Sequence, residues 1–222
     1  MIKALLFDFD GTLLNTNDLI VQTFMHVLEQ QFPNQYTAED CFNFIGPSLE
    51  QTFEQIDAAR RDELVTLYRT WNAAHHDELV TEYEGVVETL TALHAQGIRL
   101  AIVSSKSTAG IERGMNVLGV SSLFEVTVSA DDVQNVKPHP EPIFQALERM
   151  QLAREEVLMI GDNSHDIEAA HRAGVKAVGV AWSFKGEAFL RQYNPHYMLQ
   201  RMADLLTIVK ELNECEKPNV IK

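Results

Sequence analysis

The sequence predicts an α/β fold: a parallel sheet with helices on both faces and an all-helical segment inserted after the first strand. The apolar run Ile2–Phe7 stops abruptly at an acidic turn, which is typical of a parallel strand buried on both faces. Residues from about 15 to 79 show helical patterns and no convincing strand. After Gly85 short apolar runs alternate with helical patterns, which favours strands in a parallel sheet.

The inserted segment contains several predicted helices. Thr16 is a candidate N-cap, and Ser48 with Gln51 three residues later forms a capping-box pattern. The first helix should bury one stripe of apolar side chains: Leu19, Ile20, Phe24, Val27 and Leu28. Further helices are expected over Ala38–Phe44, after Ser48, and over about Arg61–Glu78, with Phe42, Phe44 and Phe53 in their core.

The alternating region completes the predicted sheet. Strands are expected at Arg99–Val103, Phe124–Val128, Val157–Ile160 and Ala177–Val180. Helices are expected at Val86–Ala95, Ala109–Leu118, Glu141–Met150, Ile167–Ala173 and Met202–Leu212. We therefore predict a Rossmann-like core from residues 1–14 and 80–222, with residues 15–79 as a helical cap. Sheets of this kind bind ligands at the carboxyl ends of their strands.

Charge and cysteine content narrow the function classes. The 222 residues carry a formal net charge of −14, which argues against a nucleic-acid or anionic-membrane partner. An anionic substrate would then need a local cation, which points towards a bound metal. Cys41 and Cys215 have no metal-ligand spacing, and no apolar run is long enough to cross a membrane, so we expect reduced thiols and a cytoplasmic protein.

The strongest chemical signal is the acidic turn after the first strand. Asp8 and Asp10 are separated by one residue where the chain begins to turn, so both carboxylates can approach one point. Clustered acids are unfavourable without a cation, and a metal is the simplest compensation. Gly11 suits a turn in which the backbone comes close to a ligand. The alternative is an ordinary acidic turn exposed to solvent.

A second acidic group follows the strand at Val157–Ile160. Asp162 and Asp166 lie in the segment Gly161–Asp166, and the charge of Asp166 at a helix start is favoured by the helix dipole. The alternative is that Asp162 or Ser164 only caps the helix. Parallel-sheet geometry would bring both acidic groups to the same edge.

A hydroxyl pair and a lysine complete the candidate set. Ser104 and Ser105 follow the strand Arg99–Val103 and offer hydroxyls and backbone amides to phosphate oxygens, although capping by Ser105 or Ser107 is the alternative. Lys137 lies in a loop that prolines stiffen, and it is one of few cations in an acidic chain.

These motifs, in this order, resemble the four motifs of the haloacid-dehalogenase-like superfamily, and they span residues 8 to 166. The resemblance implies Asp8 as nucleophile and Asp10 as general acid and base. It implies Ser104 and Lys137 as ligands of the transferred phosphoryl group, and we add Gly11, Thr12, Ser48 and Ser105 as candidate substrate contacts. Asp8, the Asp10 carbonyl, Asp162 and Asp166 would hold Mg²⁺. The inserted segment resembles the helical cap of the first cap class.

The narrower resemblance is to PpaX-type inorganic pyrophosphatases, carried by Phe44–Leu49, Leu79–Glu84 and Val180–Gly186. It implies hydrolysis of pyrophosphate to two phosphates. Lys106 and Lys185 are then candidates for neutralising the distal phosphate, or plain surface lysines.

Other functions stay open. The nearest alternative is a phosphatase for phosphoglycolate or another small phosphomonoester, and a phosphomutase would use the same aspartate pair. A receiver module that accepts phosphate once would be shorter and would lack the helical insertion. A haloacid dehalogenase is disfavoured, because Asp10 would have no purpose there.

Overall fold

The computed structural model describes residues 1–45 and 47–215, which form two compact units. The first unit comprises Met1–Leu14 and the chain from Glu82 onward, and the second comprises Asn15–Thr81. No helix among the described residues is long and apolar enough to cross a membrane.

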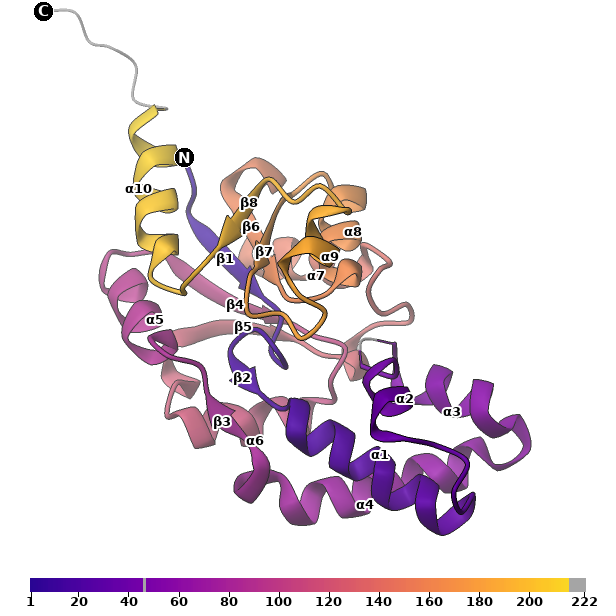
Figure 1. Cartoon of the computed structure of the whole chain (residues 1–222). Coiled ribbons are helices and arrows are strands. Elements are labelled where there is room, and N and C mark those ends of the chain that lie inside the picture. The colour runs from indigo at the N-terminus through magenta and orange to yellow at the C-terminus, as the bar shows by residue number, and fades with distance from the viewer. Residues whose placement is uncertain (46, 216–222) are drawn as a thin grey trace, which may run out of the picture. The chain divides into compact units, whose positions relative to one another are not determined.

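The first unit is built on a six-stranded sheet in which all pairings are parallel, as predicted (Figure 1). Its order is β5-β4-β1-β6-β7-β8, so the first strand of the sequence lies at the centre. Phe7, the last residue of β1, pairs with Ile102 of β4 and with Ile160 of β6. The chain therefore leaves all three strands at the same edge. The strands are β1 (Ala4–Phe7), β4 (Arg99–Val103), β5 (Phe124–Val128), β6 (Val157–Gly161), β7 (Lys176–Val180) and β8 (Tyr197–Leu199).

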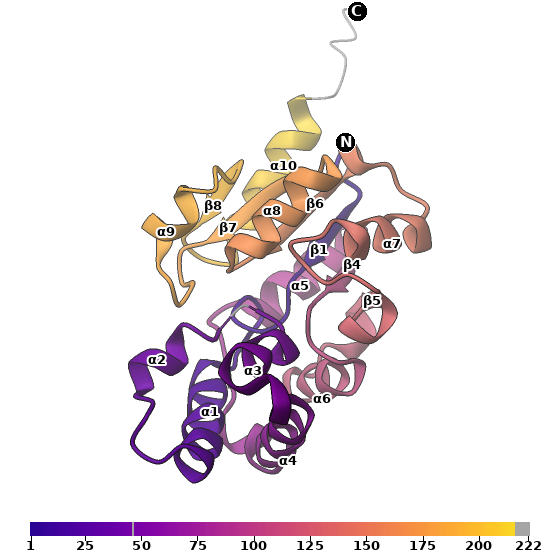
Figure 2. The ribbon, with the colours of Figure 1, turned by 90° about the vertical axis from the view of Figure 1, so that its right-hand side faces the viewer.

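Helices cover both faces of this sheet, as Figures 1 and 2 show. Ala4 and Leu6 of β1 belong to one buried cluster together with side chains from α7 (Glu141–Met150) and α8 (Ser164–Ala173). Leu5 and Phe7 are fully buried as well, and because side chains alternate along a strand they point to the opposite face. On that face lie α5 (Val86–Ala95) and α10 (Asp204–Cys215), which pack against each other. Burial on both faces explains why the strands are continuous apolar runs.

The second unit is helical and is held by an aromatic cluster. The ring of Phe24 lies 5.1 Å from Phe44, 5.6 Å from Phe53 and 4.7 Å from Tyr68, measured between centroids. The predicted stripe of the first helix faces this core, with Phe24, Val27 and Leu28 fully buried. The helices are α1 (Asn17–Gln31), α2 (Ala38–Phe42), α3 (Leu49–Asp57) and α4 (Arg61–Leu79). The capping box of Ser48 and Gln51 at α3 is confirmed.

Several short elements differ from the sequence prediction. The chain forms a two-stranded pair from β2 (Leu14–Asn15) and β3 (Thr81–Glu82), and it adds β8 and α9 (Glu187–Arg191), none of which was predicted. These elements are too short for a periodic pattern to appear. The Thr16 side chain makes no cap hydrogen bond to α1. The helix predicted from Ile167 begins earlier, at Ser164, because the Asn163 side chain caps it.

Two smaller helix bounds also change. The helix expected over Ala38–Phe44 ends at Phe42, and the last helix begins at Asp204 instead of Met202. Cys41 is a buried free thiol, whereas the side chain of Cys215 lies outside the described part of the chain.

Candidate active site

Three neighbouring strands end at the same edge of the sheet, and a candidate site residue follows each of them. Asp8 follows β1, Ser104 follows β4, and Asp162 follows β6. The sheet hydrogen bonds continue one residue past the strands: the Asp8 amide donates to the Ile160 carbonyl at 2.8 Å, and the Ser104 amide donates to the Val128 carbonyl at 2.9 Å. The backbone is therefore fixed where each side chain leaves it.

Asp8, Asp162 and Asp166 form a tight carboxylate cluster. One carboxylate oxygen from each lies within 4.8 Å of those of the other two, and Asp162 and Asp166 are buried. Burial raises the pKa of Asp162 well above its ordinary value, and the neighbouring carboxylates of Asp8 and Asp166 raise it further. The second cause is what a cluster of acids without sufficient positive charge produces.

Lys137 supplies one compensating charge from inside the cluster. Its Nζ lies 2.9 Å from Asp8 Oδ1 and 2.6 Å from Asp166 Oδ1, and it donates to the Val103 carbonyl at 2.8 Å. Burial acts to lower the pKa of Lys137, but the carboxylates of Asp166 and Asp8 outweigh it and hold the pKa above its ordinary value. The lysine is therefore a fixed cation.

The charge balance shows what the cluster still lacks. Three carboxylates face a single ammonium group, so two negative charges remain in excess when all are ionised. A divalent cation would neutralise that excess, and carboxylate oxygens are the ligands that hard cations prefer. The donor set thus fits a divalent cation.

Two glycines allow the carboxylates to come this close. Gly11 has φ +79°, and a Cβ there would lie 2.3 Å from Asp162 Oδ2. A Cβ on Gly161 would lie 2.3 Å from the Asp166 carboxylate. Thr12 is fully buried and its hydroxyl donates to Asp162 Oδ1 at 3.3 Å, so the turn after β1 holds the acid that follows β6.

The Asp166 carboxylate has two partners besides the cluster. Its Oδ2 accepts from the Asn163 amide at 3.0 Å, which forms the capping box of α8. Its Oδ1 accepts from Lys137. Asp166 therefore joins the start of α8 to the lysine loop, and the helix cap is Asn163 instead of Asp162 or Ser164.

The predicted phosphate-binding residues fall into two groups. Ser104 is buried beside the cluster, and its Oγ accepts from the Lys106 amide at 3.3 Å. Ser105 is half-buried in the same turn, and Ser107 is the residue that caps α6 (Thr108–Leu118). Ser48 belongs to the helical unit, where its hydroxyl accepts from the Gln51 amide at 3.2 Å.

Two side-chain interactions at this edge of the sheet were not predicted from the sequence. Lys106 lies with its Nζ 2.8 Å and 2.9 Å from the two carboxylate oxygens of Asp10, whereas it was a candidate for a distal phosphate. The Ser183 hydroxyl donates to the Asp162 carbonyl at 2.6 Å. Lys185 is half-buried, and burial lowers its pKa while Asp162 acts to raise it. Ser183 lies in Val180–Gly186, one of the segments that carry the narrower resemblance, and only that segment pointed to it.

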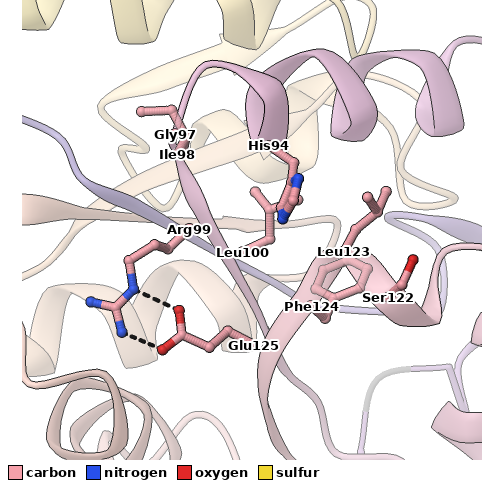
Figure 3. Close-up of a pocket in the computed structure, with 9 residues that line it drawn as sticks. All are labelled: His94, Gly97, Ile98, Arg99, Leu100, Ser122, Leu123, Phe124 and Glu125. Atoms are coloured by element: carbon pink, nitrogen blue, oxygen red, sulfur yellow. Dashed lines mark hydrogen bonds and ion pairs between the residues drawn. The ribbon is translucent and has the colours of Figure 1, made fainter.

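A pocket of about 350 Å³ lies elsewhere on the same unit (Figure 3). It is lined by residues around His94 and by the first residues of β4 and β5, and the Arg99 guanidinium and the Glu125 carboxylate in it are paired with each other. Arg99 is in register with Ala4 at the beginning of β1. The pocket therefore lies at the opposite end of the strands from the carboxylate cluster.

Comparison with known proteins identifies this parallel α/β core, with acids at the end of its central strand, as that of a hydrolase family. The model of the haloacid dehalogenase-like hydrolases matches residues 5–180. The chain belongs to that family, and it is an enzyme.

Named relatives and solved structures agree with this assignment. A protein named pyrophosphatase PpaX from Anoxybacillus flavithermus is 50% identical over 208 residues, which cover 94% of this chain and 97% of that protein. A haloacid dehalogenase-like family hydrolase from Streptococcus pneumoniae has a TM-score of 0.84 at 26% identity, covering 94% of this chain and 98% of its own. A predicted phosphoglycolate phosphatase from Haemophilus somnus has a TM-score of 0.81 at 26% identity, with the same coverage.

Proposed function

We propose that this protein is a Mg²⁺-dependent phosphohydrolase that hydrolyses inorganic pyrophosphate to two phosphates through an aspartyl-phosphate on Asp8. The observation that carries the proposal is the position of Asp8 at the end of the central strand, 2.9 Å from the Lys137 ammonium and within a three-carboxylate cluster. Such a site combines a nucleophile with positive charge for the transferred group.

Mg²⁺ is the proposed cation because every ligand is an oxygen and because membership of this hydrolase family favours Mg²⁺. Asp8, Asp162 and Asp166 would hold it, together with the backbone carbonyl of Asp10. When bound, it would supply positive charge that reduces the repulsion between Asp8 and the phosphate oxygens.

The protein groups would divide the reaction into two steps. Asp8 attacks phosphorus and forms the aspartyl-phosphate, while Asp10 donates a proton to the leaving oxygen. Lys137 and Ser104 bind the oxygens of the transferred group, since one is a fixed buried cation and the other a buried hydroxyl. Asp10 then accepts a proton from the water that attacks the intermediate, which regenerates Asp8 and releases the second phosphate.

Pyrophosphate is favoured as the substrate by the relatives that match nearly the whole chain. The relative named pyrophosphatase PpaX is 50% identical, whereas the predicted phosphoglycolate phosphatase is 26% identical. A small phosphomonoester such as phosphoglycolate is the second candidate, because that structure shares the fold at a TM-score of 0.81.

The test is a phosphate-release assay with pyrophosphate and phosphoglycolate, with and without Mg²⁺, for the wild type and Asp8→Asn. We expect Mg²⁺-dependent release, a higher kcat/KM for pyrophosphate and no turnover by the variant, which should keep the wild-type circular dichroism spectrum. Mass spectrometry of acid-quenched reactions should find phosphate on Asp8. Turnover by Asp8→Asn would show that Asp8 is not the nucleophile. A higher kcat/KM for phosphoglycolate would contradict only the proposed substrate.

The cap role of residues 15–79, with Ser48 as a phosphate contact, is part of the same proposal. Ser48 and Thr37 each form a capping box, at α3 and at α2. Ser48→Ala should raise KM for pyrophosphate, whereas Thr37→Ala removes an equivalent cap and should leave KM unchanged. Equal KM values for the two variants would show that Ser48 serves the helix alone.

A further inference from the structure

Lys106 forms an ion pair with Asp10 in which one ammonium group meets both carboxylate oxygens. The distances are 2.8 Å to Oδ1 and 2.9 Å to Oδ2, and the two side chains are 16% and 24% exposed. Two contacts to one cation fix the rotation of a carboxylate as well as its position, which a single contact does not.

The backbone of Lys106 is held as firmly as its ammonium group. Its amide donates to Ser104 Oγ at 3.3 Å, and its carbonyl accepts from the Ala130 amide at 3.0 Å. The Nζ also lies 6.0 Å from the centroid of the Phe9 ring. A lysine restrained at both ends has little side-chain entropy left to lose, in contrast to a mobile surface lysine.

Gly110 provides the space through which the lysine side chain passes. A Cβ at this position would lie 2.7 Å from Lys106 Cε, 3.1 Å from Cγ and 3.2 Å from Cδ. Gly110 lies in the first turn of α6, where its amide donates to Ser107 Oγ. Glycine within a helix is less favourable than alanine by about 1 kcal/mol, so its presence here needs a reason. The passage of Lys106 supplies that reason.

We infer that Lys106 is a positioning residue for Asp10, and that Gly110 makes the room it needs. The inference rests on the proposed function, in which Asp10 serves first the leaving oxygen and then the attacking water. Asp10 lies two residues from Asp8, which belongs to the carboxylate cluster, and like charges at short range repel each other. The lysine holds it against that repulsion in one orientation.

A direct role in substrate binding would have a different kinetic signature. Removal of a substrate contact raises KM, whereas misplacement of a proton donor lowers kcat. Lys106→Gln and Lys106→Met should therefore lower kcat by about 10- to 100-fold with KM within about twofold of the wild type. Lys106→Arg, which keeps the charge, should recover part of the lost kcat. Lys176→Gln, on an exposed lysine of β7, is the control for the same change.

A double-mutant cycle with Asp10→Asn isolates the route through which Lys106 acts. If the lysine works only by orienting the carboxylate, Lys106→Gln should cause no further loss of kcat once Asp10 is replaced. The assays should use both pyrophosphate and p-nitrophenyl phosphate, so that the measurement does not depend on the physiological substrate. Independent, multiplicative effects, or a raised KM with unchanged kcat, would overturn the inference.

Gly110→Ala tests the same mechanism without removing a charged group. The added methyl group should push the lysine side chain off Asp10, so kcat should fall in the same direction as in Lys106→Gln. The melting temperature should change little, because the better helix propensity of alanine offsets the loss of one partly exposed ion pair. An unchanged kcat would show that Gly110 has no part in placing Lys106. Loss of all turnover in Asp8→Asn together with wild-type kinetics in Lys106→Gln would defeat this inference alone and leave the proposed function intact.

Discussion

The Lys137 ammonium lies 2.6 Å from the Asp166 carboxylate, and both side chains are almost fully buried, at 3% and 2% exposed. The same ammonium reaches Asp8, so one cation joins the loop after β5 to the end of β1 and to the start of α8. This arrangement makes the lysine part of the protein's stability as well as of its chemistry.

Lys137→Met should destabilise the protein and abolish turnover. Removing the lysine leaves the buried Asp166 carboxylate and the partly buried Asp8 carboxylate without their partner, which costs on the order of 3 kcal/mol in the free energy of unfolding. Urea unfolding without metal should show this loss. Mg²⁺ should restore more stability to the variant than to the wild type, because the variant has the larger excess of negative charge.

Lys210→Met is the control for that measurement, since Lys210 is exposed on α10. It should change neither stability nor activity appreciably. A Lys137→Met protein as stable as the wild type without metal would contradict the prediction.

Gly11→Ala should disrupt the carboxylate cluster, with Gly97→Ala as a matched control. Both glycines have φ near +80°, but a Cβ at Gly97 would meet nothing within 4 Å, whereas one at Gly11 would overlap the Asp162 carboxylate. Each substitution should cost about 1 kcal/mol of backbone strain. Only Gly11→Ala should also lose activity, together with the rise in melting temperature that we expect Mg²⁺ to cause in the wild type. Equal loss of activity in both variants would attribute the effect to backbone strain alone.

Ser183→Ala should weaken metal binding without a change in the acids themselves. Ser183 is buried and its hydroxyl donates to the Asp162 carbonyl at 2.6 Å, so the variant leaves that carbonyl without this partner. We expect a loss of about 1–3 kcal/mol in unfolding free energy and a higher Mg²⁺ concentration for half-maximal activity.

Ser121→Ala removes an exposed serine whose hydroxyl bonds to Asn116, and it is the control. The Mg²⁺ dependence of that variant should match the wild type. If Ser183→Ala has the same Mg²⁺ dependence as well, the hydroxyl has no influence on the metal site.

Asp132 should make stability depend on pH in the acid range. Burial acts to raise the pKa of Asp132, but hydrogen bonds from Arg149 and Ser129 outweigh it and lower the pKa to about 2. Because the folded pKa lies below the ordinary value of 3.8, the contribution is present above pH 3.8 and is lost as the pH falls towards 2. Asp132→Asn should therefore cost about 1 kcal/mol at neutral pH, allowing for solvent screening, and progressively less on acidification.

Urea unfolding of wild type and Asp132→Asn at a series of pH values measures this difference. Arg149→Met removes the cation whose nitrogen lies 2.7 Å from Asp132 Oδ1. In the Arg149→Met protein, the loss of unfolding free energy caused by Asp132→Asn should depend less on pH than it does in the wild type. A difference between wild type and Asp132→Asn that grows on acidification would have the wrong sign and would rule the explanation out.

Much of the sheet was predictable because its strands are buried on both faces. Four residues of β1 are fully buried, and such continuous apolar runs can be recognised in the sequence alone. The short elements were not: β8 has three residues and α9 has five, too few to display a period. The start of α8 was misplaced because Asn163, instead of Asp162 or Ser164, provides the cap.

The sequence alone determined that Asp8, Ser104 and Asp162 would meet at one edge, since each follows a strand of a parallel sheet and such strands end together. The partners of these residues were decided only by the tertiary structure. Lys106 and Asp10 come from loops 96 residues apart, and their contact depends on the space left by Gly110; Ser183 reaches the Asp162 carbonyl across 21 residues. Which segments form strands follows from local patterns, whereas the partner of a long polar side chain depends on packing that no local pattern records.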